Sequence, residues 1–186
     1  MIWAENSRPV VQFSALSGQR VALRPFVMSD IVRSYIGWLN DPEVVRYSNQ
    51  RFRRHDAHSC VSFFESFRET DNLFLAIDGV DERRVVGTMT AYRSRHHGTV
   101  DVGIMLGDRQ VWGRGYGLEA WNMLTDWLLG TGGMRKLTCG TLACNHSMRS
   151  IAERSGMRLE ATRQAQEIVA GVPHDILYYA RFRSDS

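Results

Sequence analysis

The sequence predicts a single-domain α/β fold built around one mixed sheet. Segments with a strand pattern occur before, between and after segments with a helical pattern, which is the order expected of such a sheet. The length of 186 residues and a hydrophobic content of 44% suit one domain with a sizeable core. Residues 99 to 129 run from a strand through a glycine-rich loop directly into a helix. We expect the rest of the chain to be organised around this stretch.

The first half of the chain is expected to alternate strands and helices. Residues 1 to 19 carry little pattern and form a lead-in to a domain at 20 to 186. The expected elements are a short strand near Val10 to Phe13, a strand at 21–25, helices at 31–39, 42–48 and 56–69, and a strand hairpin at 73–77 and 84–93. Ser29 or Asp30 would cap the first helix, and Pro42 suits the first position of the second.

In the second half, a strand at 99–106 precedes the glycine loop and a helix whose apolar residues repeat at helical spacing. The remaining expected elements are a strand at 136–142, a helix capped by Asn145 or Ser147 that stops at Gly156, and strands at 157–166 and 176–182 joined by a turn at 171–173. In the strand at 99–106, Asp101 should point to the same face as Gly103 and Met105.

The loop places Gly113, Gly115 and Gly117 at alternate positions just before the helix. Residues without a Cβ let the backbone approach a ligand closely. The first N–H groups of a helix have no partner inside the helix, so they can point at a phosphate. Arg109 and Arg114 would add positive charge, and the pattern therefore predicts a polyphosphate site. A turn that merely precedes a core helix is the alternative.

Two common phosphate loops do not fit these residues. A Walker loop needs GxxxxGK followed by Ser or Thr, whereas the only lysine of this chain is Lys136, away from the glycines. A dinucleotide fingerprint needs GxGxxG, whose third glycine would fall on Leu118 if the motif began at Gly113.

The segment DVGIMLGDRQVWGRGYGLEA, residues 101–120, resembles the signature of the GCN5-related N-acetyltransferase (GNAT) superfamily, and most of all its RimJ/RimL-type branch of ribosomal-protein N-terminal acetyltransferases. In that superfamily a Q/R-x-x-G-x-G/A loop binds the pyrophosphate of acetyl-coenzyme A. The alternatives for this loop are Trp112 with Gly115 and Gly117, or Gln110 with Gly113 and Gly115. The resemblance implies a mostly antiparallel sheet flanked by helices, with splayed central strands.

The resemblance also implies where the coenzyme lies. The strands at 99–106 and 136–142 would leave unpaired backbone groups for the pantetheine arm, and Gly103 would mark a bulge that opens the sheet. The implied coenzyme contacts are Ile104, Met105 and Leu106 at the thioester, Arg109, Gln110, Val111, Trp112, Gly113, Arg114, Gly115, Tyr116 and Gly117 in the loop, and Asn145 and Ser150 on a later helix.

Direct amide synthesis needs a neutral amine, yet an alkyl ammonium with a pKa near ~10.4 stays protonated at pH 7. A base must therefore remove a proton, directly or through water. Asp101, where this branch commonly carries a carboxylate, is the candidate, and an exposed strand-end acid is its equal alternative. His96 and His97 are weaker candidates. Asn145 is expected to bond the pantetheine arm, with helix capping as the alternative.

The departing thiolate would benefit from a general acid. Many relatives carry a tyrosine seven residues after the asparagine, but this chain has Ala152 there. Ser150, Tyr178 or an ordered water would have to serve instead.

The first helices and the strand around Tyr178 resemble branch members that modify small amines, including amino groups of nucleotide-linked sugars. A small-molecule amine is thus the expected acceptor, and Trp38, Tyr92 and His97 are its expected contacts. The alternatives are acetylation of a protein N-terminus of the ribosomal-protein type and a non-catalytic acyl-CoA-binding module. The basic run RFRRH at 51–55 is either a solvated loop or faces an acidic acceptor or a coenzyme phosphate.

Composition argues against other classes. The 23 basic and 20 acidic residues are interspersed, so no nucleic-acid partner is expected. No stretch approaches the ~20 apolar residues of a membrane span. Cys60, Cys139 and Cys144 are an odd number without metal-type spacing, which favours reduced thiols in the cytoplasm and no metal. We expect a monomer or a homodimer.

Overall fold

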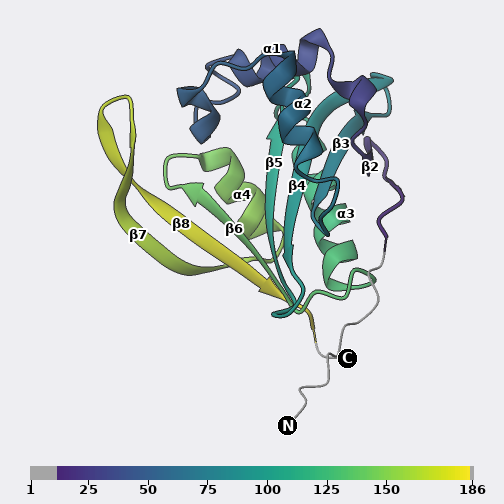
Figure 1. Ribbon diagram of the computed structural model, residues 1–186. Helices are drawn as coiled ribbons and strands as arrows, with labels where there is room; N and C mark the ends of the chain where they lie inside the picture. The colour runs from purple at the N-terminus through teal and green to yellow at the C-terminus, as the bar shows by residue number, and fades with distance from the viewer. Residues whose placement is uncertain (1–11, 185–186) are drawn as a thin grey trace.

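The computed structural model describes residues 12–184 as one eight-stranded sheet with helices on both faces (Figure 1). The strands are β1 (Leu16–Ser17), β2 (Val21–Pro25), β3 (Leu73–Gly79), β4 (Arg84–Ser94), β5 (Thr99–Leu106), β6 (Lys136–Leu142), β7 (Arg158–Val169) and β8 (Val172–Phe182). The helices are α1 (Arg33–Asn40), α2 (Ala57–Glu65), α3 (Tyr116–Leu129) and α4 (His146–Arg154), with short 3-10 turns η1 (Met28–Asp30), η2 (Asn49–Phe52) and η3 (Arg109–Val111).

The strand order is β1-β2-β3-β4-β5-β6-β8-β7, and every neighbouring pair is antiparallel except β5 with β6. These two parallel strands pair at three positions: Thr99 with Lys136, Val100 with Leu137, and Asp101 with Thr138. Beyond Asp101 they diverge, and Figure 1 shows the gap widening toward α1. The predicted mixed, mostly antiparallel sheet with splayed central strands is confirmed.

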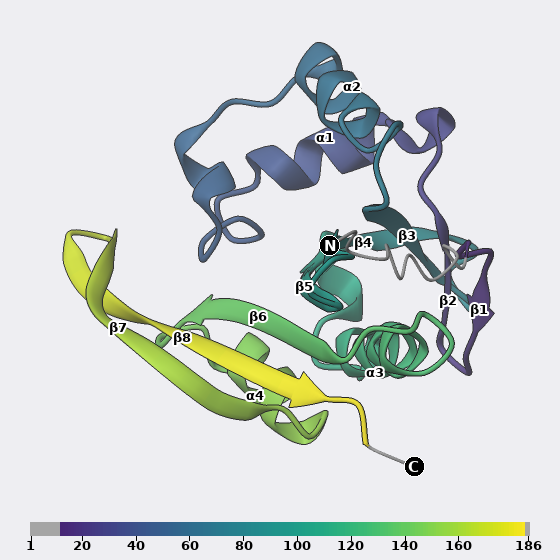
Figure 2. The same ribbon diagram turned by 60° about the horizontal axis from the view of Figure 1, so that its bottom comes forward.

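The sheet carries a separate hydrophobic core on each face. Helices α3 and α4 cover one face, where Trp121, Leu124 and Leu128 are fully buried. Helices α1 and α2 cover the other, where Tyr35 and Cys60 are buried among aromatic rings. Figure 2 shows the two helix pairs on opposite sides. Each layer is thus held by its own apolar contacts, and the gap between β5 and β6 lies between the layers.

Several predicted elements need correction. The helix predicted at 42–48 is wrong, because the backbone N–H of Val45 bonds the Asp41 carbonyl at 3.0 Å in a single turn that does not continue. The third helix ends at Glu65 rather than near residue 69. The bulge predicted at Gly103 is wrong, since the pairing of β4 with β5 runs through Gly103 and Thr90 without a shift. The sheet opens on the β6 side instead.

The predicted strands at both ends of the domain also differ. The final hairpin is longer than expected, because Ala170 and Gly171 both adopt positive φ and form a two-residue turn between β7 and β8. The short strand near residues 10 to 13 lies partly outside the described residues. Phe13 itself is buried edge-on against Trp127 at 5.0 Å, and the strand lies further on, at Leu16–Ser17.

None of the helices within residues 12–184 is long and apolar enough to cross a membrane. The same residues contain no group of three or more His, Cys, Asp or Glu side chains placed to hold a metal ion. Cys139 is a free thiol buried in the core.

Candidate functional site

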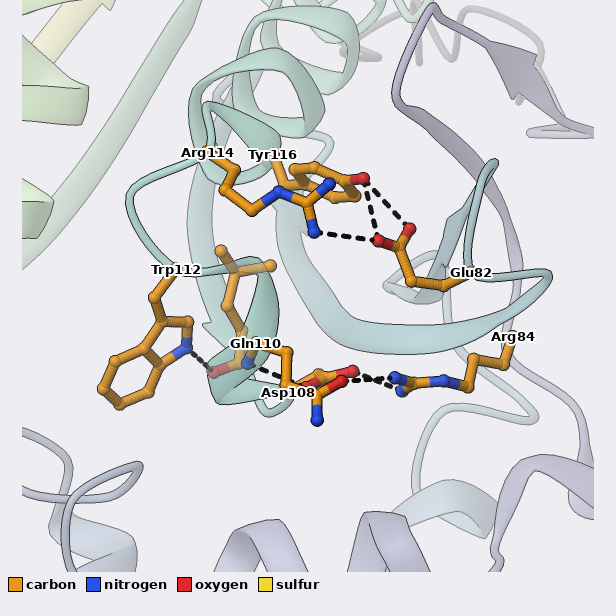
Figure 3. A network of polar contacts seen from close by, with 8 residues as sticks. Glu82, Arg84, Asp108, Gln110, Trp112, Arg114 and Tyr116 are labelled. Carbon is orange, nitrogen blue, oxygen red and sulfur yellow. Dashed lines mark hydrogen bonds and ion pairs between the residues drawn. The ribbon is translucent and has the colours of Figure 1, made fainter.

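The loop between β5 and α3 is fixed at its start by Asp108. One carboxylate oxygen of Asp108 accepts the backbone N–H of Gln110 at 2.9 Å, and the other forms an ion pair with Arg84 (Figure 3). Asp108 is buried, so both contacts also satisfy a charge that would otherwise be costly. Val111 then inserts fully into the core and ends η3. The loop is therefore a built turn with a defined shape.

Two glycines adopt the backbone conformation that connects the loop to the start of α3. Gly113 and Gly115 have φ of 73° and 88°, which L side chains rarely adopt. Gly115 is the N-cap of α3 and supplies no side chain to cap it. Within residues 12–184, the backbone N–H groups of Tyr116, Gly117 and Leu118 have no hydrogen-bond partner. The positive end of the α3 dipole therefore has three unpaired N–H donors, which is what an anion site at a helix N-terminus requires.

Gly117 allows close packing between α3, α4 and the end of β5. A Cβ at Gly117 would lie 3.2 Å from both Ile151 and Leu106 side-chain carbons. Its absence lets the first turn of α3 approach the end of β5 and helix α4 closely. The three glycines therefore have two separate roles, backbone shape at Gly113 and Gly115 and close contact at Gly117.

The charged residues around the loop are paired with carboxylates. Arg114 lies 3.2 Å from Glu82, whose two oxygens also accept the Tyr116 hydroxyl at 3.0 Å (Figure 3). Arg109 lies 3.7 Å from Asp41 at the end of α1. These acids are far away in sequence and gave no local signal. Both arginines remain about half exposed, so each can also reach a ligand.

A third such pair links Arg20 to Glu119 in the first turn of α3. The Glu119 carboxylate accepts the Arg20 backbone N–H at 2.8 Å and its guanidinium at 3.0 Å. The Arg20 guanidinium Nε would lie 3.9 Å from a Cβ at Gly115. Arg20 is therefore a cation beside the helix terminus that sequence reasoning missed, since it lies in the turn between β1 and β2, far from the loop in sequence.

The remaining loop residues differ in what they expose. The side chains of Val111 and Tyr116 are buried, so only their backbone atoms can contact a ligand. Trp112 is 40% exposed, and its indole N–H donates to the Leu106 carbonyl at 2.9 Å (Figure 3). Gln110 is exposed, and its side-chain oxygen accepts from Arg84 at 3.4 Å.

The residues predicted beside the thioester lie where β5 leaves β6. Ile104 and Leu106 pack toward the α3 and α4 core, whereas Met105 packs toward α1 and α2. No pair joins β5 to β6 beyond Asp101 in the described chain, so the edge of this segment faces the gap. An extended chain could therefore add to the edge as a further strand.

Asp101 lies at the narrow end of the gap, in the last residue pair before the strands part. Its carboxylate accepts the Thr138 hydroxyl at 2.9 Å. Although the residue keeps contact with solvent, the surrounding protein desolvates the carboxylate and raises its pKa, and the Thr138 hydrogen bond opposes that shift. Tyr92 is directly opposite on β4, and its pKa is raised by burial and, to a smaller degree, by the Asp101 charge.

The three predicted acceptor contacts are not brought together. Trp38 lies against Gly107 at the wide end of the gap, where a Cβ on the glycine would be 2.0 Å from the indole. Tyr92 is beside Asp101. His97 is in the exposed turn before β5, at the opposite end of that strand from the loop, and its carbonyl accepts from Arg135 at 2.7 Å.

On α4, Asn145 has the capping role considered for it. Its side-chain oxygen accepts the Met148 backbone N–H at 3.2 Å, which leaves the amide NH₂ as a donor. Ser150 is exposed, and Ala152 is fully buried and contributes no polar group. Tyr178 lies over Gly140, on the face of the sheet that Asp101 shares.

Substitutions at Asn145 can separate capping from ligand contact. We expect Asn145→Ala to lower the free energy of unfolding by about 1 kcal/mol because a helix N-cap is lost. Asn145→Asp keeps the capping oxygen and should leave the free energy of unfolding nearly unchanged, while removing the NH₂ donor. Chemical denaturation measures the first effect, and coenzyme A titration of Asn145→Asp measures the second. Equal stability of Asn145→Ala and the wild type would contradict the capping role.

Comparison with known proteins gives the family of this fold and site. A family model described as an acetyltransferase (GNAT) domain matches residues 20–158. No curated protein sequence matches. A GNAT-family acetyltransferase from Bacillus anthracis superposes with a TM-score of 0.78 at 16% identity, covering 92% of this chain and 99% of its own.

Two further solved structures have the same fold. The microcin C7 self-immunity acetyltransferase, solved with acetyl-CoA and AMP, has a TM-score of 0.76 at 19% identity, with 89% of this chain and 93% of its own covered. The ribosomal-protein-S5-alanine acetyltransferase from Vibrio fischeri has a TM-score of 0.77 at 14% identity, with 93% and 98% covered. The family model spans most of the chain, and the chain therefore belongs to the GNAT acetyltransferase family.

Proposed function

We propose that the protein is an acetyl-CoA-dependent N-acetyltransferase that acts on a primary amine of a small molecule. One observation carries this proposal: the uncapped N-terminus of α3 lies at the end of the β5 edge that faces the gap in the sheet. The first feature suits a diphosphate and the second suits the amide-bearing arm of coenzyme A. Together they fit a ligand that has both parts in that order.

The residues present fit coenzyme A in detail. The N–H groups of Tyr116, Gly117 and Leu118 would hold the pyrophosphate, with Arg20 and Arg114 nearby as cations. Gly113 and Gly115 have no side chain, so they would contact the ligand through backbone atoms. Their positive φ shapes the loop that leads into α3. The segment Ile104 to Leu106 would lie along the pantetheine arm.

Asp101 is the proposed base. The ammonium first gives a proton to Asp101, directly or through water, and the neutral amine nitrogen then forms a bond to the acetyl carbon. The thioester C–S bond breaks, and the second proton on the nitrogen passes to solvent. The raised pKa of Asp101 brings it closer to the working pH than an ordinary aspartate, which makes it a better proton acceptor. The sulfur leaves as a thiolate that takes up a proton to give free coenzyme A.

For that last proton, the chain offers few donors. Ala152 excludes a tyrosine at the position usual among relatives, and Ser150 is exposed on α4. Tyr178 shares the Asp101 face of the sheet and is the side chain we propose as donor, with an ordered water as the alternative.

The acceptor class is supported by the fold neighbours only at the level of an amine. The S5-alanine enzyme is named for a protein N-terminus, whereas the microcin enzyme was solved with AMP. A small-molecule amine, such as an amino group on a nucleotide-linked compound, is our proposal for this chain. The protein N-terminus is the second candidate.

Release of free thiol from acetyl-CoA tests the proposal. With a panel of small amines and N-terminal peptides, we expect amine-dependent thiol release and a mass gain of one acetyl group on an amine. Coenzyme A binding without any amine-dependent release would instead support the non-catalytic acyl-CoA-binding alternative. A chain that binds no coenzyme A at all would refute the proposed function.

A further inference from the structure

A cavity of about 350 Å³ lies between the segment after α1 and the tip of the β7–β8 hairpin. Four arginines line it, Arg46, Arg51, Arg53 and Arg54, and none of its lining residues is acidic. The volume is within the range of small-ligand pockets. A concave site with four guanidinium groups and no carboxylate in its wall is suited to an anion.

Arg51 connects the two walls of this cavity. Its guanidinium stacks on Phe52 at 4.3 Å, and its Nη2 donates to the Ile168 carbonyl at 3.2 Å and lies 3.5 Å from Glu167. The side chain is 14% exposed, and its Nη1 is buried without a hydrogen-bond partner among residues 12–184. An unsatisfied buried donor on a charged group is costly, and this guanidinium adds to the positive potential of the cavity wall, which favours an anion there.

The loop that presents the arginines is held at its base. The Asn40 side chain donates to the His55 carbonyl at 2.8 Å and accepts the His55 backbone N–H at 2.9 Å. This reciprocal pair closes the segment from the end of α1 to the start of α2. The arginines therefore lie on an anchored loop, which reduces the entropy lost when a ligand binds.

The cavity adjoins the wide end of the gap between β5 and β6. Asn40 and Pro42 line it, and Asp41 between them pairs with Arg109 of the coenzyme loop at 3.7 Å. Trp38, on the same helix end, packs on Gly107 directly after β5. The second wall comes from the hairpin whose strand β8 borders β6. A compound in the cavity would thus lie beside the proposed transfer site.

We infer that this cavity binds a phosphate group of the acceptor, so that the acceptor is an amine that also carries a phosphate ester or diphosphate. Four guanidinium groups offer more N–H donors than one carboxylate can accept, whereas phosphate oxygens can bond several at once. This inference rests on the proposed function for the identity of the ligand as acceptor. It does not depend on that function for anion binding itself.

Inorganic pyrophosphate is the probe for the cavity. Calorimetric titration would use protein saturated with coenzyme A and, separately, the Gly115→Glu variant, in which the helix terminus is blocked without coenzyme. We expect pyrophosphate to bind in both and to bind at least tenfold more weakly when Arg53→Gln and Arg54→Gln are combined. Arg158→Gln, an exposed arginine at the start of β7, is the matched control and should leave the affinity unchanged.

Matched acceptors then test the acceptor class. We expect glucosamine 6-phosphate to be a better substrate or a stronger inhibitor than glucosamine. The Arg53→Gln, Arg54→Gln double variant should lose this preference for the phosphorylated amine and keep the wild-type affinity for coenzyme A. No pyrophosphate binding, or binding unaffected by the double variant, would overturn the inference. So would a loss of coenzyme affinity in the double variant, because the cavity would then hold a coenzyme phosphate.

The same experiment separates this inference from the proposed function. If the wild type binds no coenzyme A, the proposed function fails, while pyrophosphate binding to Gly115→Glu still decides the anion site. If coenzyme A binds and pyrophosphate does not, the inference alone fails. Stronger competition by an aspartate-rich peptide than by phosphate amines would also overturn it, in favour of a protein acceptor.

Discussion

Replacement of Gly115 by glutamate is expected to abolish coenzyme A binding, with an affinity at least 100-fold below that of the wild type. The new carboxylate would lie at the N-terminus of α3, where the proposed pyrophosphate site is. Two like charges about 4 Å apart near a protein surface repel by about 4 kcal/mol, which exceeds the energy of a 100-fold change. Arg20, 3.9 Å from the Cβ position, would hold the carboxylate in place. Calorimetric titration with coenzyme A measures the effect.

Two controls separate charge from backbone strain. Gly115→Gln has the same shape and the same unfavourable φ, which costs about 1–2 kcal/mol, but carries no charge. Gly133 also has a positive φ, of 73°, and open space for a Cβ, so Gly133→Glu repeats the strain and the charge away from the site. We expect Gly115→Glu, Gly115→Gln and Gly133→Glu to have similar unfolding temperatures, all below that of the wild type. Unchanged coenzyme affinity in Gly115→Glu would remove the helix terminus from the site.

Asp101→Asn is expected to lower kcat by about 100-fold or more, because a general base commonly contributes that much. Asparagine still accepts the Thr138 hydroxyl, so the local structure should persist. In the wild type, kcat/KM should fall as the pH drops through the pKa of Asp101, which desolvation raises above the usual aspartate value. The variant should lack this decline. A pH–rate profile that is the same in both proteins would exclude Asp101 as the base.

The same pKa shift has a consequence for stability. A carboxyl whose pKa is raised by folding contributes fully to stability when protonated, and that contribution is lost as the pH rises through the raised pKa. Ionised Asp101 therefore destabilises the fold at neutral pH. Asp101→Asn should unfold at a higher temperature than the wild type at pH 7, and the difference should vanish at acidic pH. Thr138→Val, which removes the opposing hydrogen bond, should move the decline in kcat/KM to higher pH.

The best predicted part of the molecule was the one with the strongest local signals. β5, the glycine loop and α3 form an uninterrupted series of patterns, and β6 begins and ends where its β-forming residues do. The helix predicted at 42–48 failed for the opposite reason. Pro42 suits a helix start, but a turn around Asp41 satisfies the local N–H groups first, and Ser48 then caps the separate turn η2.

The contacts that shape the candidate site could not be predicted because they join distant segments. Glu82 and Tyr116 are 34 positions apart, and Arg51 and Glu167 are 116 apart. Sequence patterns report which residues lie on one face of one element, but not which loops meet. The cavity at the basic run 51–55 could not be predicted for the same reason, because its second wall comes from the β7–β8 hairpin.

Only three residue pairs join β5 to β6, so the two halves of the described sheet are connected by a short ladder. On either side of it, the strands are joined by long antiparallel ladders that resist deformation. A small rotation of one half of the sheet relative to the other about this ladder would change the width of the gap between β5 and β6 while breaking few hydrogen bonds. A guest that bonds both borders would favour one angle over others, so occupancy and shape are coupled. Ligand binding should consequently restrict the rotation of the two halves of the sheet relative to each other.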